Sequence, residues 1–268
     1  MRIVVPVKHV PDIHSVRTLT AAGRIARTAE DGTLNELDEN AIETALRIVE
    51  AFGPDQREAH EVIALTVGPE VADGAIRKAL QLGVDTGVRV TDPALAGSDV
   101  FGTAKTIAAA IRRIEAAGPI DLIITGMAAL DGLGSVIPTL LAAELELPQV
   151  TLATKLSVAD GVIEATRELD GVTEVIAASL PVVASVTDHV NTPRYPNFKL
   201  IMAARTKEIA VLGLSDLGVD PASVGDAGAR THVTKSRQRP DRELTQVVID
   251  KGEGGLALAQ YLIDNELV

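Results

Sequence analysis

The stretch DLIITGMAALDGLGSVIPTLLAAE, residues 121–144, is the clearest indication of the fold class, because it passes from strand to loop to helix within one short segment. Asp121–Thr125 is a short, mostly β-branched run, which is typical of a buried strand. A glycine-rich loop, residues 126–135, follows it. Val136–Glu144 then carries the apolar periodicity of a helix. The order of strand, loop and helix predicts one unit of an α/β sheet.

The same alternation precedes this stretch. Strands are expected at Arg2–Val7, Glu61–Val67 and Gly87–Val90, and helices at Leu37–Glu50, Val71–Leu82 and Phe101–Ala117. Strands that alternate with helices predict a doubly wound, mostly parallel α/β sheet. Ligands of such sheets bind beyond the carboxyl ends of the strands, where the strand order reverses. We therefore expect the loops after Val7, Val67 and Thr125 to line one crevice.

Composition narrows the class of protein. The chain has 268 residues, a formal charge of −12, no cysteine and few aromatic residues. Its length suits one large domain, and its core must consist of Ala, Val, Leu and Ile. The absence of cysteine excludes disulfides, thiol catalysis and iron–sulfur ligation. The negative charge argues against nucleic acid or an anionic membrane as partner. Without a spanning apolar run or a signal peptide, we expect a cytoplasmic protein.

The second half of the chain changes character twice. Lys155–Thr166 predicts a hairpin that turns at Asp160-Gly161, and strands at Glu174–Ala178 and Val182–Thr187 are expected to extend the sheet. From Leu214 onward Gly, Pro and Asp interrupt regularity, and a helical pattern returns only at Leu256–Glu266. We therefore divide the chain into an α/β domain, 1–213, and an extended C-terminal arm, 214–268. An arm of this length is expected to wrap another subunit.

Residues 126–135 are the strongest candidate for a binding loop. Glycines let the backbone approach a ligand closely, and the helix that follows offers free amides to a phosphate. The loop is neither the dinucleotide fingerprint nor a Walker motif. Two roles are open for Ser135, a hydroxyl contact with a phosphate and a cap of the following helix.

A second candidate is the segment HVNTPRYPNFKLIM, residues 189–202, here called the recognition loop. Its Pro and Asn residues predict a loop that contains neither regular helix nor strand. Two of the chain's aromatic residues, Tyr195 and Phe198, lie in it, and an aromatic anchor on a loop is typical of a binding hot spot. The alternative is that Phe198 turns inward and holds the loop to the body.

The evidence for catalytic residues is weaker than that for the two binding segments. His9 and His14 lie near Asp12, but a metal site needs a third ligand and a spacing that the neighbouring residues do not provide. No Ser-His-Asp set or pair of carboxylates stands in a supporting context. These patterns indicate a binding or carrier protein without catalytic residues of its own.

The pattern Asn-x-Pro-Arg-x-Pro from Asn191, followed by Ile-Met-x-Ala and a basic residue, resembles the signature of the β subunit of electron transfer flavoprotein. The resemblance covers nearly the whole chain. It includes Val5–Asp12, Asn35–Ala45, Gly68-Pro69, Gly126–Ala142 and Gly252–Gly255. The spacing Asp131-Gly132-x-Gly134-Ser135-x-x-Pro138 resembles the loop variant of actinobacterial members. The resemblance implies an adenine-nucleotide α-hydrolase-like fold.

The resemblance also implies cofactors. AMP would lie in the crevice on this subunit, and FAD would lie mainly on a partner α subunit, with residues 10–14 of this chain near the flavin. The implied AMP-binding residues are Pro6, Val7, Lys8, Asn40, Thr66, Val67, Gly68, Gly126, Asp131, Gly132, Leu133, Gly134, Ser135, Val136 and Ile137. Because Ser135 to Pro138 replace the usual side-chain ligands, main-chain contacts must contribute more of the binding.

Three of these side chains have open roles. Asp131 is expected to fix the loop through bonds to backbone amides, since a carboxylate does not suit a phosphate. Lys8 either neutralises a phosphate or is a solvated charge. Asn40, with Glu39, either reaches a ribose or belongs to a cluster at the start of its helix.

The implied partners are the α subunit, contacted by the arm, acyl-CoA-type dehydrogenases, and a quinone oxidoreductase that receives the electrons. The recognition loop would dock the dehydrogenase with Phe198 as its apolar anchor. Its implied partner-binding residues are Arg194, Tyr195, Phe198, Lys199, Ile201 and Met202. Arg194, Lys199, Arg205 and Lys207 would form a basic patch that attracts an acidic partner.

Two alternatives are open. In a bifurcating flavoprotein a second FAD replaces AMP and reacts with NADH, but the loop 126–135 lacks the Asp-Thr-x-x-Val-Gly run usual in those members. A stand-alone adenine-nucleotide sensor of the same fold would have no use for the arm or for the recognition loop.

Overall fold

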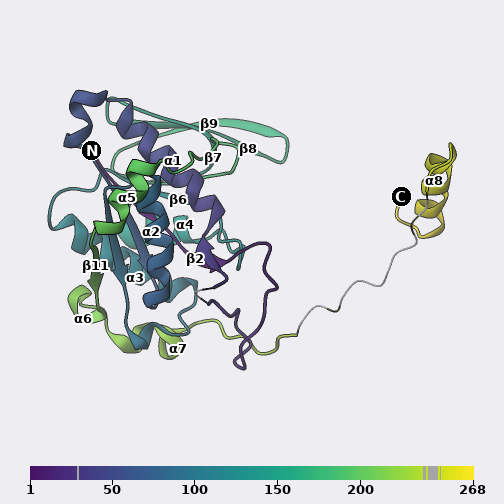
Figure 1. Cartoon of the computed structure of the whole chain (residues 1–268), viewed down its shortest axis with the longest axis horizontal. Helices are drawn as coiled ribbons and strands as arrows, with labels where there is room; N and C mark the ends of the chain where they lie inside the picture. Colours follow the sequence, from purple (N-terminus) through teal and green to yellow (C-terminus); the bar gives the residue numbers. More distant parts are fainter. Residues whose placement is uncertain (29, 238–239, 241–246, 248) are drawn as a thin grey trace. The chain divides into compact units, whose positions relative to one another are not determined.

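The computed structural model describes residues 1–28, 30–237, 240, 247 and 249–268, and these form two compact units, Met1–Lys235 and Ser236–Val268. The first unit is built on a nine-stranded sheet (Figure 1). Its strands are β1 Arg2–Pro6, β4 Glu61–Val67, β5 Thr86–Val90, β6 Leu122–Gly126, β7 Gln149–Ala159, β8 Val162–Leu169, β9 Val172–Ser179, β10 Val182–Val186 and β11 Ile209–Leu212. A small two-stranded sheet joins β2 His9–Pro11 to β3 Gly32–Leu34.

The strand order is β11-β5-β4-β1-β6-β10-β7-β8-β9. Pairing is parallel from β11 to β7 and antiparallel for β7 with β8 and β8 with β9. From β1 the chain builds outward through β4 and β5, and from β6 it builds in the opposite direction. The sheet is therefore doubly wound and mostly parallel, as predicted, and its order reverses between β1 and β6.

Helices cover both faces of this sheet (Figure 1). One face carries α1 Glu36–Glu50, α2 Asp73–Leu82 and α5 Phe198–Thr206, and the other carries α3 Val100–Glu115 and α4 Ile137–Leu145. Successive side chains of β1 alternate between the faces, so Ile3 and Val5 contact the first group while Val4 contacts the second. Because both faces are buried, the strands are nearly continuous apolar runs.

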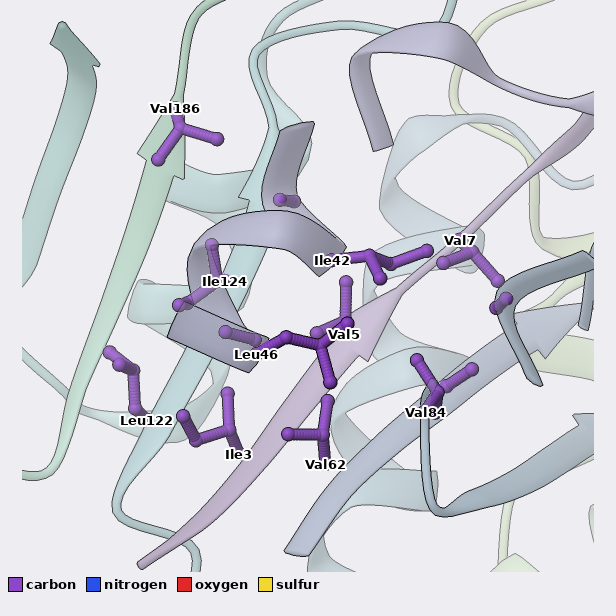
Figure 2. Close-up of a cluster of buried hydrophobic side chains, with 14 of the residues drawn as sticks. Ile3, Val5, Val7, Ile42, Leu46, Val62, Val84, Leu122, Ile124 and Val186 are labelled. Atoms are coloured by element: carbon purple, nitrogen blue, oxygen red, sulfur yellow. The ribbon is translucent and has the colours of Figure 1, made fainter. Parts of the chain in front are cut away.

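The core beneath α1 consists of aliphatic side chains (Figure 2). Ile42 and Leu46 of α1 lie over Ile3, Val5 and neighbouring strand residues, all of them buried. Glu36 and Glu39 lie in the first turn of α1 and Arg47 in its last turn, so charges of suitable sign stand at both ends of the helix. This packing fixes the start of α1 over the boundary between β1 and β6.

The hairpin prediction is confirmed. β7 and β8 turn through Asp160 and Gly161, whose φ angles of 50° and 75° are those of a tight two-residue turn. β9 and β10 continue the sheet, also as expected.

The recognition loop is shorter than predicted. Phe198 is the first residue of α5, and the side chain of Asn197 accepts a hydrogen bond from the Leu200 amide at 2.9 Å. The expectation that residues 198–202 avoid a helix is therefore wrong. An Asn just before an apolar run is also a helix cap, and it acts as one here.

The body also extends beyond residue 213. Short helices follow there, α6 Leu214–Leu217, a 3₁₀ turn at Pro221–Ser223 and α7 Gly225–Gly228. Leu214, Val219 and Val224 are buried in a small cluster with Leu95 and Ala109. These three apolar residues hold the segment to the body. They stand singly between Gly, Asp and Pro, so their spacing has neither the period of a helix nor that of a strand. The second unit contains α8, Gly254–Asp264.

The remaining helices are short 3₁₀ turns at Pro54–Ala59, Glu70–Ala72 and Pro93–Leu95. Within the described residues, no helix has both the length and the apolar character needed to cross a membrane.

Candidate functional site

The start of α1 joins the carboxyl ends of β1 and β6. The Asp38 carboxylate accepts a hydrogen bond from the Lys8 amide, just after β1, at 2.8 Å. Gly126 ends β6, and a Cβ atom there would lie 2.6 Å from the Leu37 carbonyl oxygen. Only glycine permits this approach of strand and helix. The start of α1 thus meets β1 and β6 at the point where the strand order reverses, which is where a crevice was predicted.

Asn35 fixes the loop 126–135 from behind. Its side-chain amide donates to the Ala128 carbonyl at 2.9 Å, and its carbonyl oxygen accepts from the Leu130 amide at 3.0 Å. The side chain is fully buried, so both bonds are shielded from water. The sequence patterns gave Asn35 no role in the site. Asn35 stands at the N-cap position of α1, but its side chain bonds to the loop and does not cap the helix.

The outer part of the loop is open. The amides of Gly132 and Leu133 donate to the Ala129 carbonyl at 3.1 and 2.7 Å, which forms a turn. Leu133 and Ser135 have φ angles of 47° and 52°. A Cβ atom on Gly132 or Gly134 would meet no described atom within 4 Å. Packing within the described part of the chain therefore does not require glycine at these two positions.

Helix α4 begins without a side-chain cap among the described residues, because its N-cap is Val136. The capping role considered for Ser135 is therefore wrong, since Ser135 precedes the cap position. Pro138, in the first turn, has no amide hydrogen, and the other first-turn amides lack partners within the helix. These amides face the end of the open loop and suit an anion.

Asp131 binds cations, where we expected backbone amides. Its carboxylate accepts from the Lys8 ammonium at 2.8 Å and from the Arg27 Nε at 2.8 Å. Burial acts to raise the pKa of Asp131, but the charges and hydrogen bonds of Lys8 and Arg27 outweigh it and hold the pKa below its ordinary value. Asp131 still fixes the loop, by tying it to β1 and to the segment that contains Arg27.

Asp38 is an unusual carboxyl group. Burial raises its pKa to about 7, although hydrogen bonds with Asn35, Lys8 and Gly126 act in the opposite direction. The group that joins β1 to β6 therefore exchanges its proton near neutral pH.

Other predicted residues lie at the carboxyl ends of β1 and β4. Pro6 ends β1, and the Val7 amide donates to the Leu65 carbonyl at 2.8 Å. The Thr66 hydroxyl donates to the Val7 carbonyl at 2.8 Å, which ties β4 to β1. Val67 ends β4, and Gly68 donates to the Val90 carbonyl. Among the described side chains, the buried Thr125 hydroxyl beside Gly126 has no hydrogen-bond partner.

Asn40 belongs to a different contact. Its side-chain amide donates to the Asn191 carbonyl at 3.0 Å, and the Asn191 amide donates to the Asn40 carbonyl at the same distance. Glu39 forms an ion pair with Lys78. Asn40 thus holds the recognition loop against α1, and this geometry does not bring it to the loop 126–135.

The recognition loop and the start of α5 expose large apolar side chains. Tyr195 is 93% exposed, Phe198 78% and Met202 43%; these three residues are here called the docking surface. The interpretation in which Phe198 turns inward is therefore wrong. Ile201 is half-buried on the same helix.

The basic patch beside it is smaller than expected. The Arg194 guanidinium donates to Glu50 at 2.6 Å and to Glu43 at 2.7 Å. These bonds raise the pKa of Arg194, and the bond to Glu50 has the largest effect. Lys207 donates to the Val84 carbonyl at 2.8 Å. Both cations thus hold the body together. Lys199 and Arg205 are exposed and remain available to a partner.

Comparisons with known proteins agree with the resemblance. A family model described as "Electron transfer flavoprotein domain" matches residues 22–217. "Electron transfer flavoprotein subunit beta" of Mycobacterium tuberculosis is 41% identical over 267 residues, 99% of each chain. The protein of the same name from Thermoanaerobacterium thermosaccharolyticum is 33% identical over 87% of this chain and 86% of its own. "Caffeyl-CoA reductase-Etf complex subunit CarD" of Acetobacterium woodii is 31% identical over 90% of this chain and 88% of its own.

Proposed function

This chain belongs to the electron transfer flavoprotein family as a β subunit, and we propose that it works in a heterodimer as a simple electron carrier. FAD, held mainly by the α subunit, would accept electrons from acyl-CoA-type dehydrogenases and pass them to a quinone oxidoreductase. The flavin supplies the redox chemistry in this scheme. The residues of this chain bind, position and shield, and none of them reacts.

We assign structural AMP to the crevice between β1 and β6. One observation carries this assignment: the loop 126–135 is clamped from behind by Asn35, while Gly132 and Gly134 on its outer side have empty space around them. A backbone that is held rigid and left uncovered by side chains suits a ligand that contacts main-chain atoms. The uncapped start of α4 adds amides for a phosphate.

Residues 10–14 would form the flavin wall of this subunit. Ile13 is 44% exposed, although it is a large apolar residue. An exposed aliphatic side chain beside an isoalloxazine ring would exclude water from it without hydrogen bonding.

The docking surface would bind the dehydrogenase. Tyr195, Phe198 and Met202 expose apolar area that gains free energy when a partner covers it. Lys199 and Arg205 lie beside them on α5 and would attract acidic residues of the partner. The second unit supports an obligate partner as well, because α8 exposes Leu256, Leu258, Tyr261 and Ile263. A stand-alone sensor has no use for either surface.

The carrier role is tested by rapid mixing under anaerobic conditions. The chain is co-expressed with an α subunit, and the purified complex is mixed with a reduced acyl-CoA dehydrogenase or with NADH. Flavin reduction by the dehydrogenase, with no reduction by NADH, supports the carrier. Direct reduction by NADH would instead support the bifurcating alternative. Reduction by neither donor would count against both.

A further inference from the structure

One carboxylate in the nucleotide crevice carries two cations. Lys8 and Arg27 bind opposite oxygens of Asp131, each at 2.8 Å. The Asp131 side chain is completely covered, whereas the Lys8 and Arg27 side chains are 45% and 38% exposed. Two cations and one anion leave a local excess of one positive charge, on a chain whose formal charge is −12.

Arg27 lies in a segment whose sequence shows neither a strand pattern nor a helix pattern. It lies in residues 13–28, here called the strap, which lie between β2 and β3. Leu19 and Ile25 pair within the strap, and Arg27 then reaches the loop 126–135, far away in sequence. The strap thus places a guanidinium beside the loop and Lys8.

Both cations keep donors for a ligand. A guanidinium has five N–H groups and an ammonium has three. The bonds to Asp131 use the Nε and Nη2 of Arg27 and the Nζ of Lys8. The remaining donors suit a phosphate, which prefers a planar, pre-oriented guanidinium.

The loop 126–135 itself contains no cationic side chain. Val136, Ile137 and Pro138 follow Ser135 and offer no side-chain donor. A phosphate bound at the start of α4 would carry up to two negative charges that main-chain amides compensate only in part. A cation must therefore come from outside the loop.

We propose that Arg27, held by Asp131 beside Lys8, is a phosphate-binding residue for the adenine nucleotide of this subunit. This inference rests on the proposed AMP site. Arg27 contacts the 5′-phosphate, and Asp131 positions it. The competing role is structural: Arg27 only ties the strap to the loop. A structural tie affects every ligand of the crevice, whereas a phosphate contact affects only phosphorylated ones.

The test uses the full-length chain in complex with its α subunit, with Arg27→Gln and Arg27→Lys as variants. Arg24→Gln is the matched control, because Arg24 lies in the same strap but pairs with Asp226 of α7. Equilibrium dialysis on complexes freed of nucleotide measures the affinity for AMP and for adenosine. FAD content reports that each complex is assembled.

We expect Arg27→Gln to weaken AMP about 10- to 100-fold, as for the loss of a charged hydrogen bond, and to leave adenosine unchanged. Arg27→Lys should keep part of the AMP affinity, and Arg24→Gln should change neither ligand. An equal loss for AMP and adenosine would overturn the inference in favour of the structural tie. Unchanged AMP affinity in Arg27→Gln would overturn it as well. If the wild-type complex binds no AMP, the proposed AMP site itself fails, and the inference with it.

Discussion

At the scale of single residues, glycines of one loop have different tasks. Gly126 lets β6 approach the backbone of α1, and an added Cβ would collide with a carbonyl that cannot move freely. Gly134 has empty space around it, so packing within the described part of the chain does not require a glycine there. The first glycine therefore serves the fold, and we assign the second to the ligand.

This difference predicts opposite results for two alanine substitutions in the complex. Gly126→Ala should lower the stability by about 1–3 kcal/mol, because the core must shift to accept the methyl group. Gly134→Ala should leave the thermal midpoint of the nucleotide-free complex unchanged but reduce the AMP retained after purification. Calorimetry and nucleotide analysis measure the two effects. A destabilised Gly134→Ala complex with full AMP content would reverse the assignment.

A second prediction concerns how the stability of the complex depends on pH through Asp38. Its folded-state pKa of about 7 lies above the ordinary 3.8, so between these values the folded state holds a proton that the unfolded state has released. The stabilisation from this group is therefore present at low pH and is lost as the pH rises towards 7. The expected loss is a few kcal/mol at most.

Asp38→Asn should remove this dependence, since the amide does not titrate. Thermal midpoints of both complexes, measured from about pH 5 to about pH 8, provide the test. The wild-type midpoint should fall more steeply with pH than that of the variant. Parallel curves would show that Asp38 does not titrate in this range.

Sequence alone predicted which loop would bind a ligand, but not the bonds that hold this loop. The strand-loop-helix pattern identified Gly126 and the open loop, because glycine spacing is a local signal. Asn35 and Arg27 contact that loop from positions far away in the chain, and no local pattern reports such pairs. Asp131 was assigned the wrong partners for the same reason.

At the scale of elements, α5 and the segment before it form a surface fixed by one arginine. Arg194 bonds to Glu43 and Glu50 of α1, and the Glu43 side chain is only 4% exposed. Lys199, in the first turn of α5, is exposed. We therefore assign Arg194 to stability and propose Lys199 for partner binding.

Arg194→Ala should destabilise the complex by about 1–3 kcal/mol, because a buried carboxylate loses part of its hydrogen bonding. Lys199→Ala should leave stability unchanged and slow the association with the dehydrogenase, more so at low salt. Thermal unfolding and stopped-flow association at two salt concentrations separate the effects. A stable Arg194→Ala complex that associates slowly would assign Arg194 to the docking surface after all.

Elements were predicted well where both faces are buried. Glu61–Val67 matches β4 in both bounds, since a strand covered on two sides is an apolar run with clear ends. The prediction was wrong where one residue type is common in two kinds of local structure. Pro196-Asn197 indicated a loop, yet the same Asn caps α5. The helix pattern of Leu256–Glu266 agrees with α8, whose periodicity is local.

At the scale of the whole molecule, the chain separates into a body, Met1–Lys235, and a second unit, Ser236–Val268. The body is longer than the 1–213 domain expected from sequence, because three isolated apolar residues hold the segment after 213 in place. We propose that the second unit is the part of the arm that wraps the α subunit.

A chain that ends at Lys235 should therefore fold with a body stability close to that of the full-length chain, yet bind the α subunit much more weakly. Circular dichroism with thermal unfolding checks the first expectation, and co-purification with a tagged α subunit checks the second. An unfolded truncated chain would show that the second unit belongs to the body. Undiminished binding would remove it from the interface.

We propose above all that this β subunit binds AMP in the crevice and works beside a single flavin. The most direct measurement is the amount of each nucleotide released when the purified heterodimer is denatured. We predict one FAD and one AMP per heterodimer. Two FAD and no AMP would contradict the claim and place this chain among bifurcating flavoproteins.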